Sequence, residues 1–109
     1  MNAPVNLVNL REVTDGDVEL ERELFQIFLD SSEECLARLH ESCTAKAEEE
    51  WRQCVHAWKG ISFNLGAEQL GQLCKIAQDN HAAPIEKKLQ MLAELQSEFK
   101  QVKKYLQGL

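Results

Sequence analysis

The stretch WRQCVHAWKGISFNL, residues 51–65, has the periodicity of one amphipathic helix with two unlike faces. At about 100° per residue, one side of this helix collects a broad stripe of mostly apolar residues. The stripe consists of Trp51, Cys54, Val55, Trp58, Ile61, Ser62 and Leu65. A stripe of this width is typical of a helix that packs against the core of an all-α protein. His56 lies on the opposite side and is therefore predicted to face solvent.

The face around His56 combines a glycine with two cations. The residues within roughly 60° of His56 are Glu49, Arg52, Lys59, Gly60 and Phe63. A glycine inside a helix costs about 1 kcal/mol relative to alanine, so Gly60 requires a reason. That reason is either close contact with another helix or removal of a side chain that would crowd the imidazole. Because Lys59 and Arg52 place cations beside the ring, we predict that His56 carries an anionic group.

Residues 56–67, with the sequence HAWKGISFNLGA, resemble the signature of histidine-containing phosphotransfer (Hpt) domains. Leu70 and Leu73 continue the pattern in register, and residues 23–30 are similar to the helix that precedes the signature. Ile61 departs from the pattern, because a small residue is usual at its position. The resemblance implies an antiparallel four-helix bundle that presents one phosphorylatable histidine.

By position, the resemblance implies that His56 accepts and donates the phosphoryl group, with Lys59 as the neighbouring cation and Gly60 as the clearing residue. Gln78, on the following helix, corresponds to a polar residue that in some members hydrogen-bonds the imidazole. The implied partners are receiver domains of response regulators and hybrid histidine kinases, which exchange the phosphoryl group through an aspartate. Such a protein is a phosphoryl carrier rather than an enzyme with kinase activity.

Length and composition agree with one domain that spans residues 1–109. Hydrophobic residues make up 44% of the chain, and a formal net charge of −6 argues against binding to nucleic acid. No apolar run is long enough to span a membrane, and residues 1–4 do not begin a signal peptide, so we expect a cytoplasmic protein. We also expect a monomer that uses no cofactor.

Helix-start and helix-stop residues place the first two long helices. The first is expected over residues 18–42, with Asp17 as its N-cap. The second, which carries His56, is expected to begin after Thr44 as N-cap and to run to Leu65. Gly66 then suits the residue that ends this helix in a left-handed conformation.

Two further helices are expected in the second half of the chain. One covers residues 67–81, and the next has Pro84 in its first turn and ends at Gly108. The inward-facing positions expected on this last helix are Leu89, Leu92, Leu95, Phe99, Val102 and Leu106. Its charged residues are expected to face solvent. Before all four helices, an apolar segment within residues 1–16 is expected to pack over one end of the bundle.

The first long helix has an apolar stripe wider than one neighbouring helix requires. The stripe consists of Leu20, Leu24, Phe25, Phe28, Leu29, Cys35, Leu36 and Leu39. We therefore expect some of it, including Phe25 and Phe28, to stay exposed near His56 as a docking patch. Arg52 and Phe63 are expected to extend this patch from the helix that carries His56. Ordinary core packing of each aromatic side chain is the alternative.

Other function classes stay open at this point. The cysteines are Cys35, Cys43, Cys54 and Cys74. They form no Cys-x-x-Cys pair, so we expect reduced thiols and no metal site. The alternative is a metal-binding bundle built from Cys35, His40, Cys43, Cys54, His56 and His81. A second alternative is a helical adaptor that docks a signalling partner without phosphoryl transfer. No phosphate-binding loop occurs, and Ser62 is predicted on the core side without a base, so neither ATP use nor hydrolysis is expected.

Overall fold

The computed structural model describes residues 3–45 and 47–109, apart from the side chains of residues 44 and 45. In this part of the chain the regular structure is entirely helical, which confirms the predicted all-α class. The helices are α1 (Val8–Thr14), α2 (Val18–Ala45), α3 (Glu48–Leu65), α4 (Glu68–Asp79) and α5 (Ile85–Gln107).

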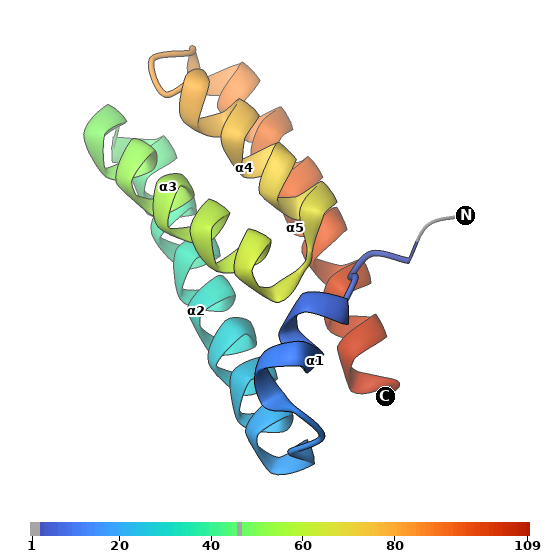
Figure 1. Ribbon diagram of the computed structural model, residues 1–109. Helices are drawn as coiled ribbons and strands as arrows, with labels where there is room; N and C mark the ends of the chain where they lie inside the picture. Colours follow the sequence, from blue (N-terminus) through green and yellow to red (C-terminus); the bar gives the residue numbers. More distant parts are fainter. Residues whose placement is uncertain (1–2, 46) are drawn as a thin grey trace.

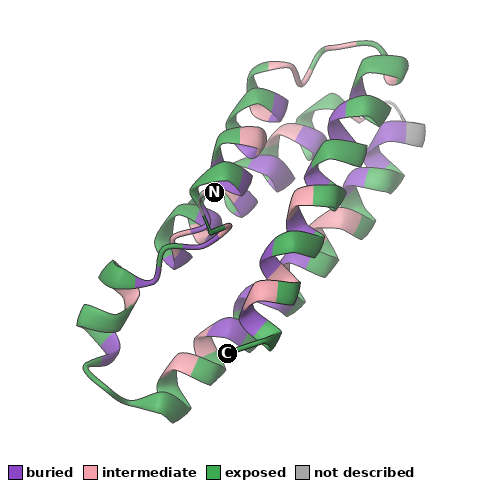
Figure 2. Cartoon of the chain, turned by 90° about the vertical axis from the view of Figure 1, so that its right-hand side faces the viewer, coloured by how far each residue is buried: buried purple, intermediate pink, exposed green. Residues whose placement is uncertain are grey.

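Helices α2 to α5 alternate in direction along the long axis of the molecule (Figure 1). Helix α3 packs against α2 and α4, and α5 contacts the same two neighbours. Each helix turns its buried residues toward the shared interior and its exposed residues outward (Figure 2). The result is an antiparallel arrangement of four helices with one core, as the resemblance to Hpt domains implied.

Two helices of the bundle are long and two are shorter, and the N-terminal segment packs at one end of this uneven bundle. Helices α2 and α5 have 28 and 23 residues, whereas α3 and α4 have 18 and 12. Helix α1 packs against α2 at the end where α3 turns into α4 (Figure 1). Val5 and Leu7 are buried there, so the prediction that a short N-terminal segment packs over one end is confirmed.

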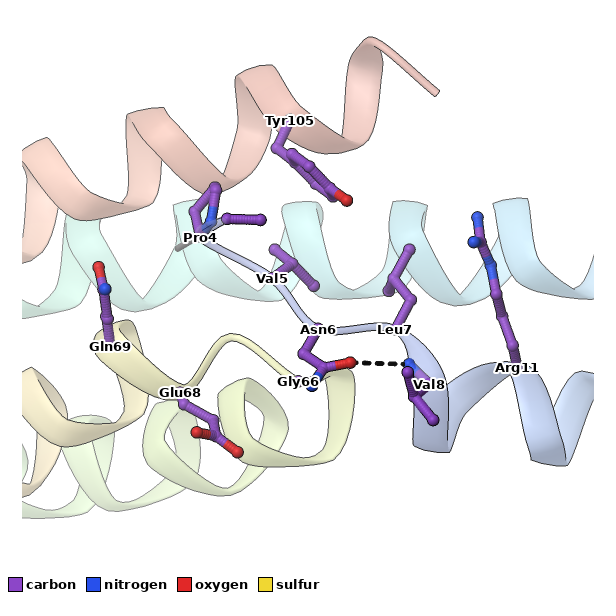
Figure 3. A pocket seen from close by; sticks show the side chains of 11 residues that line it. Pro4, Val5, Asn6, Leu7, Val8, Arg11, Gly66, Glu68, Gln69 and Tyr105 are labelled. Atoms are coloured by element: carbon purple, nitrogen blue, oxygen red, sulfur yellow. Dashed lines mark hydrogen bonds between the residues drawn. The ribbon is translucent and has the colours of Figure 1, made fainter. Parts of the chain in front are cut away.

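Asn6 joins this segment to the turn after α3. Its backbone N–H donates a hydrogen bond of 2.9 Å to the carbonyl oxygen of Gly66. Its side-chain Oδ1 accepts a hydrogen bond of 3.1 Å from the Val8 N–H at the start of α1 (Figure 3). The segment and Tyr105 of α5 border a cavity of about 700 Å³ (Figure 3).

Helix boundaries confirm the predicted caps at two places. The Leu20 N–H donates a hydrogen bond of 3.0 Å to Oδ1 of Asp17, which is the predicted N-cap of α2. Gly66 ends α3 with φ +100°, as predicted for its left-handed conformation.

The start of α3 was predicted wrongly. Helix α2 continues to Ala45, so Thr44 belongs to α2, and its side chain lies outside the described residues. Helix α3 begins at Glu48, after Ala47. Ala47 cannot accept a hydrogen bond through its side chain, but three glutamates in the first turn favour the positive end of the helix dipole. The negative charges of these glutamates, rather than a capping hydroxyl group, therefore stabilise the start of α3.

Two differences also appear around α5. Pro84 is extended, with φ −64° and ψ 160°, and lies just before the helix rather than in its first turn. Leu89, predicted to face inward, is 49% exposed, whereas Lys88 is only 3% exposed. The Lys88 ammonium lies 5.3 Å from the centre of the Trp51 ring. Its apolar stem covers the indole and its charge meets the face of the ring, so Lys88 takes the core position.

Trp51 and Trp58 anchor α3 to its neighbours, and both are fully buried. The Trp51 indole N–H donates a hydrogen bond of 2.9 Å to the carbonyl oxygen of Ala77 in α4. The Trp58 indole N–H donates one of 2.8 Å to Oγ of Ser32 in α2. The Trp58 ring also meets Phe99 of α5 edge-on, with centroids 6.0 Å apart. These contacts fix the rotation of α3 about its axis and therefore determine which of its residues face outward.

Replacing Gly66 with alanine is expected to lower the free energy of unfolding by at least about 3 kcal/mol. Gly66 has a positive φ, which strains the backbone of any residue with a Cβ atom. That Cβ atom would also lie 1.9 Å from the carbonyl oxygen of Asn6. Gly16 is the matched control, because it also has positive φ but no described atom beyond its two chain neighbours lies within 4 Å of its Cβ position. Gly16→Ala should therefore cost about 1 kcal/mol, the conformational part alone. Urea unfolding of both variants measures the difference, and equal losses would contradict the close approach of Asn6.

Candidate functional site

His56 lies near the middle of α3, and its side chain is exposed, as the helical periodicity predicted. No hydrogen bond or ion pair joins its imidazole to another residue in the described part of the chain. Trp51 and Trp58, on the opposite face, anchor the helix on either side of His56 in the sequence. The imidazole is therefore open to a partner, while the backbone that carries it is held in place.

Gly60, one turn after His56, leaves open space on this face. Apart from the two chain neighbours and the surrounding backbone of α3 itself, no heavy atom of the described residues lies within 4 Å of the position that a Cβ atom would take at Gly60. Close contact with another helix, the first of the two explanations considered from the sequence, is therefore excluded. The second explanation fits, because the missing side chain clears the surface beside His56.

Gly71 of α4 is the glycine that close helix packing requires. A Cβ atom at Gly71 would lie 2.6 Å from Cε1 of Phe63, so the aromatic ring rests directly on the α4 backbone. Phe63 is 39% exposed and lies on the same side of α3 as His56, as predicted. The role of Gly71 was not predicted from the sequence, although a glycine inside a helix was the signal that could have indicated it.

The cations around His56 differ in their surroundings. Lys59 is half-buried and makes no ion pair within the described residues. Burial raises the pKa of the Cys74 thiol on α4, and the Lys59 ammonium opposes that rise. Lys59 is thus a cation whose charge remains available to an anion on the imidazole.

Arg52 is already paired within α3. Its Nε donates a hydrogen bond of 3.0 Å to Oε2 of Glu49, and the Gln53 amide donates one of 3.3 Å to the other carboxylate oxygen. The hydrogen bond from Arg52 lowers the pKa of Glu49, and the same bond raises the pKa of Arg52. Since Glu49 offsets its charge, Arg52 is a weaker second cation than the sequence suggested.

Gln78 lies half-buried on α4, and the structure does not join it to the imidazole. No hydrogen bond connects Gln78 with His56 in the described chain. Its Oε1 atom is buried and has no hydrogen-bond partner among the described residues. The contact implied by the family resemblance is therefore not made in this structure.

A family model for the Hpt domain matches residues 23–105, which include α3, α4 and most of α2 and α5. The chain belongs to the Hpt domain family. It is therefore a histidine phosphotransfer protein of a phosphorelay, from a family of phosphoryl carriers rather than kinases.

A solved structure supports the same family. The chain is similar to histidine-containing phosphotransfer protein B from Pseudomonas aeruginosa PAO1, with 25% sequence identity and a TM-score of 0.85. The similarity covers 99% of this chain and 95% of the other. No curated protein sequence matches this chain at a significant level.

The predicted exposure of Phe25 and Phe28 in this Hpt domain was wrong. Phe25 is 8% exposed and Phe28 is 4% exposed, and the Phe28 ring lies 6.3 Å from that of Phe99 in α5. The stripe on α2 is wide because α2 packs against both α3 and α5, and this packing buries the aromatic side chains. The alternative of ordinary core packing was correct for both.

Ile27 is the large apolar side chain that α2 does expose beside α3. It is 61% exposed and borders an apolar cleft of about 160 Å³. The cleft is lined by Leu10, Leu24, Ile27, Phe28, Ser31, Ile61, Asn64 and Leu65. Ile61, the residue that departs from the family pattern, therefore contributes its side chain to a surface cleft between the two helices.

The cysteines and Ser62 bear on the metal-binding and hydrolase alternatives to a phosphoryl carrier. All four cysteines are free, and burial raises the pKa of the half-buried Cys35 thiol to about 11. Within residues 3–45 and 47–109, no group of three or more His, Cys, Asp or Glu side chains could hold a metal ion. Ser62 is buried on the core side of α3.

No helix among the described residues has the length and apolar character that crossing a membrane would require.

Proposed function

We propose that this Hpt domain relays a phosphoryl group between aspartates of receiver domains, with His56 as the carrier. The observation that supports this most strongly is the exposed imidazole with open space on its Gly60 flank. A receiver must bring a phosphorylated aspartate into line with one ring nitrogen, which requires access rather than a deep pocket. We further propose that residues 1–109 act as one cytoplasmic domain and as a monomer.

The proposed transfer exchanges one phosphorus bond for another. The unprotonated ring nitrogen of neutral His56 attacks phosphorus, and an N–P bond forms as the bond from phosphorus to the aspartate oxygen breaks. The aspartate leaves with the electron pair as a carboxylate, and the proton on the other ring nitrogen stays in place. Transfer to a second receiver runs the same step in reverse. Lys59 offsets the charge on the phosphoryl oxygens, because no described carboxylate pairs with it.

The proposed docking face for the receivers lies on α2 and α3 beside His56. It consists of Ile27, Gly60, Ile61, Phe63 and Asn64 and contains part of the apolar cleft between the helices. Ile27 and Ile61 take the role that sequence analysis gave to Phe25 and Phe28. A small apolar face with a polar border suits a contact that must form and dissociate repeatedly.

Incubation with a radiolabelled phosphorylated receiver domain tests the proposal. A panel of purified receivers, each loaded from labelled acetyl phosphate, is mixed with the Hpt domain. We expect at least one to transfer label in a form that is stable to alkali and labile to acid, as expected for a phosphorus–nitrogen bond. Mass spectrometry under alkaline conditions should locate the added phosphate on His56.

The controls distinguish transfer from the adaptor alternative. Acetyl phosphate without a receiver should leave the Hpt domain unlabelled, because the chain has no phosphate-binding loop of its own. Stable binding to a phosphorylated receiver with no movement of label would support the adaptor instead. Label on a residue other than His56 would disprove the proposed carrier.

A further inference from the structure

Helix α4 presents a row of residues next to the His56 face of α3. Gly71, Lys75 and Gln78 are four and three residues apart and therefore share one side of α4. Gly71 lies under the Phe63 ring, which shows that this side of α4 meets the outward face of α3. Gln78 is half-buried and Lys75 is exposed, so Lys75 lies at the outer border of the contact between the helices.

The antiparallel register of α3 and α4 places Lys75 at the same height along the bundle as the residues next to His56. Phe63 and Gly71 are in contact, and the two helices run in opposite directions from the turn at Gly66. Moving four residues along each helix from this contact pairs Lys75 with Lys59. Lys59 is three residues from His56, or about 4.5 Å along the helix axis. Neighbouring helix axes lie about 8–10 Å apart, a span that a lysine side chain can largely cross.

The charge of Lys75 is available. No hydrogen bond or ion pair engages it within the described residues, and Asp79, one turn further on, makes no ion pair with it. Arg52 differs, because Glu49 accepts its hydrogen bonds. In a chain with net charge −6, two unpaired lysines at one level form a local cationic site.

We propose that Lys75 is the second cation that contacts the phosphoryl group on His56, approaching from α4 while Lys59 approaches from α3. This inference rests on the proposed function and gives to Lys75 the role that the sequence suggested for Arg52. Two ammonium groups on the same side of the imidazole stabilise the charge on the equatorial oxygens during transfer and in the phosphorylated protein. The Gly60 side then remains free for the receiver.

Lys75→Gln, Lys75→Arg and Lys100→Gln test the inference. Lys100 is the matched control, because it is also exposed and unpaired in the described structure but belongs to α5. We expect Lys75→Gln to slow transfer from a phosphorylated receiver to His56 about tenfold, less than the loss from a buried oxyanion donor. Lys75→Arg should retain most of the rate, and Lys100→Gln should match the wild type.

A readout without the receiver separates contact with the phosphate from contact with the partner. In purified phosphorylated protein, Lys75→Gln should change the ³¹P chemical shift of phosphohistidine and its rate of hydrolysis, and Lys100→Gln should change neither. If Lys75→Gln matches Lys100→Gln in transfer rate, chemical shift and hydrolysis, Lys75 does not contact the phosphoryl group. In that case normal labelling of wild-type His56 leaves the proposed function intact, whereas a wild type that never accepts phosphate on His56 overturns both.

Discussion

Gly60→Leu is expected to give a protein that is more stable than the wild type and nearly unable to exchange phosphoryl groups. The stability gain should be about 0.5–1 kcal/mol, because leucine is a better helix former and, beyond the adjoining residues and backbone of α3, no described atom lies within 4 Å of the Cβ position. The transfer rate should fall by about a hundredfold or more, because the new side chain holds the receiver aspartate away from the His56 ring. Urea unfolding and the labelling assay measure the two effects on the same preparation.

Gly60→Ala is the matched control for this prediction. It should give the same gain in stability, because its methyl group also enters open space. It should reduce transfer much less than leucine, since a methyl group extends only a short way beyond the helix surface. If leucine and alanine reduce transfer equally, the loss comes from the helix backbone and not from obstruction. If Gly60→Leu transfers at the wild-type rate, the clearance beside His56 has no function.

His56→Gln is expected to abolish acceptance of the phosphoryl group and to leave the fold intact. Glutamine keeps a polar side chain on an exposed helix position but has no nitrogen lone pair that can attack phosphorus. The imidazole makes no hydrogen bond in the described structure, so the free energy of unfolding should change by less than about 0.5 kcal/mol. The label incorporated from a phosphorylated receiver is the measurement.

His40→Gln is the control for histidine chemistry elsewhere in the chain. His40 is exposed on α2, and its replacement should leave labelling at the wild-type level. Persistent acid-labile label on the His56→Gln protein would show that another residue carries the phosphate. Loss of label together with a large loss of stability would instead mean that His56 supports the fold, contrary to its exposure.

Sequence alone predicted the features that depend on one helix. The rotation of α3, with both tryptophans inward and His56 outward, follows from the spacing of its own apolar residues. The hydrogen bond at Asp17 and the left-handed Gly66 also depend on residues within one turn. Local physics decides these features, so periodicity and capping rules were sufficient.

Features that depend on contacts between helices could not be predicted in the same way. Phe25 and Phe28 are buried because α2 packs against both α3 and α5, and periodicity does not show how many helices a given helix contacts. Lys88 replaces Leu89 in the core because the Trp51 ring lies where its stem and charge both fit. Gly71 is required because a ring from α3 reaches it. Each outcome depends on the register between helices.

The hydrogen bonds of Trp51 and Trp58 have a consequence for how this protein transmits a signal. Because Trp51 and Trp58 fasten the helix to both neighbours, we expect the backbone to keep the same shape before and after His56 is charged. Information is then encoded by occupancy of a single side chain and not by a rearranged conformation. Donor and acceptor can recognise one invariant surface, and the direction of flow is left to the relative energies of their acyl phosphates.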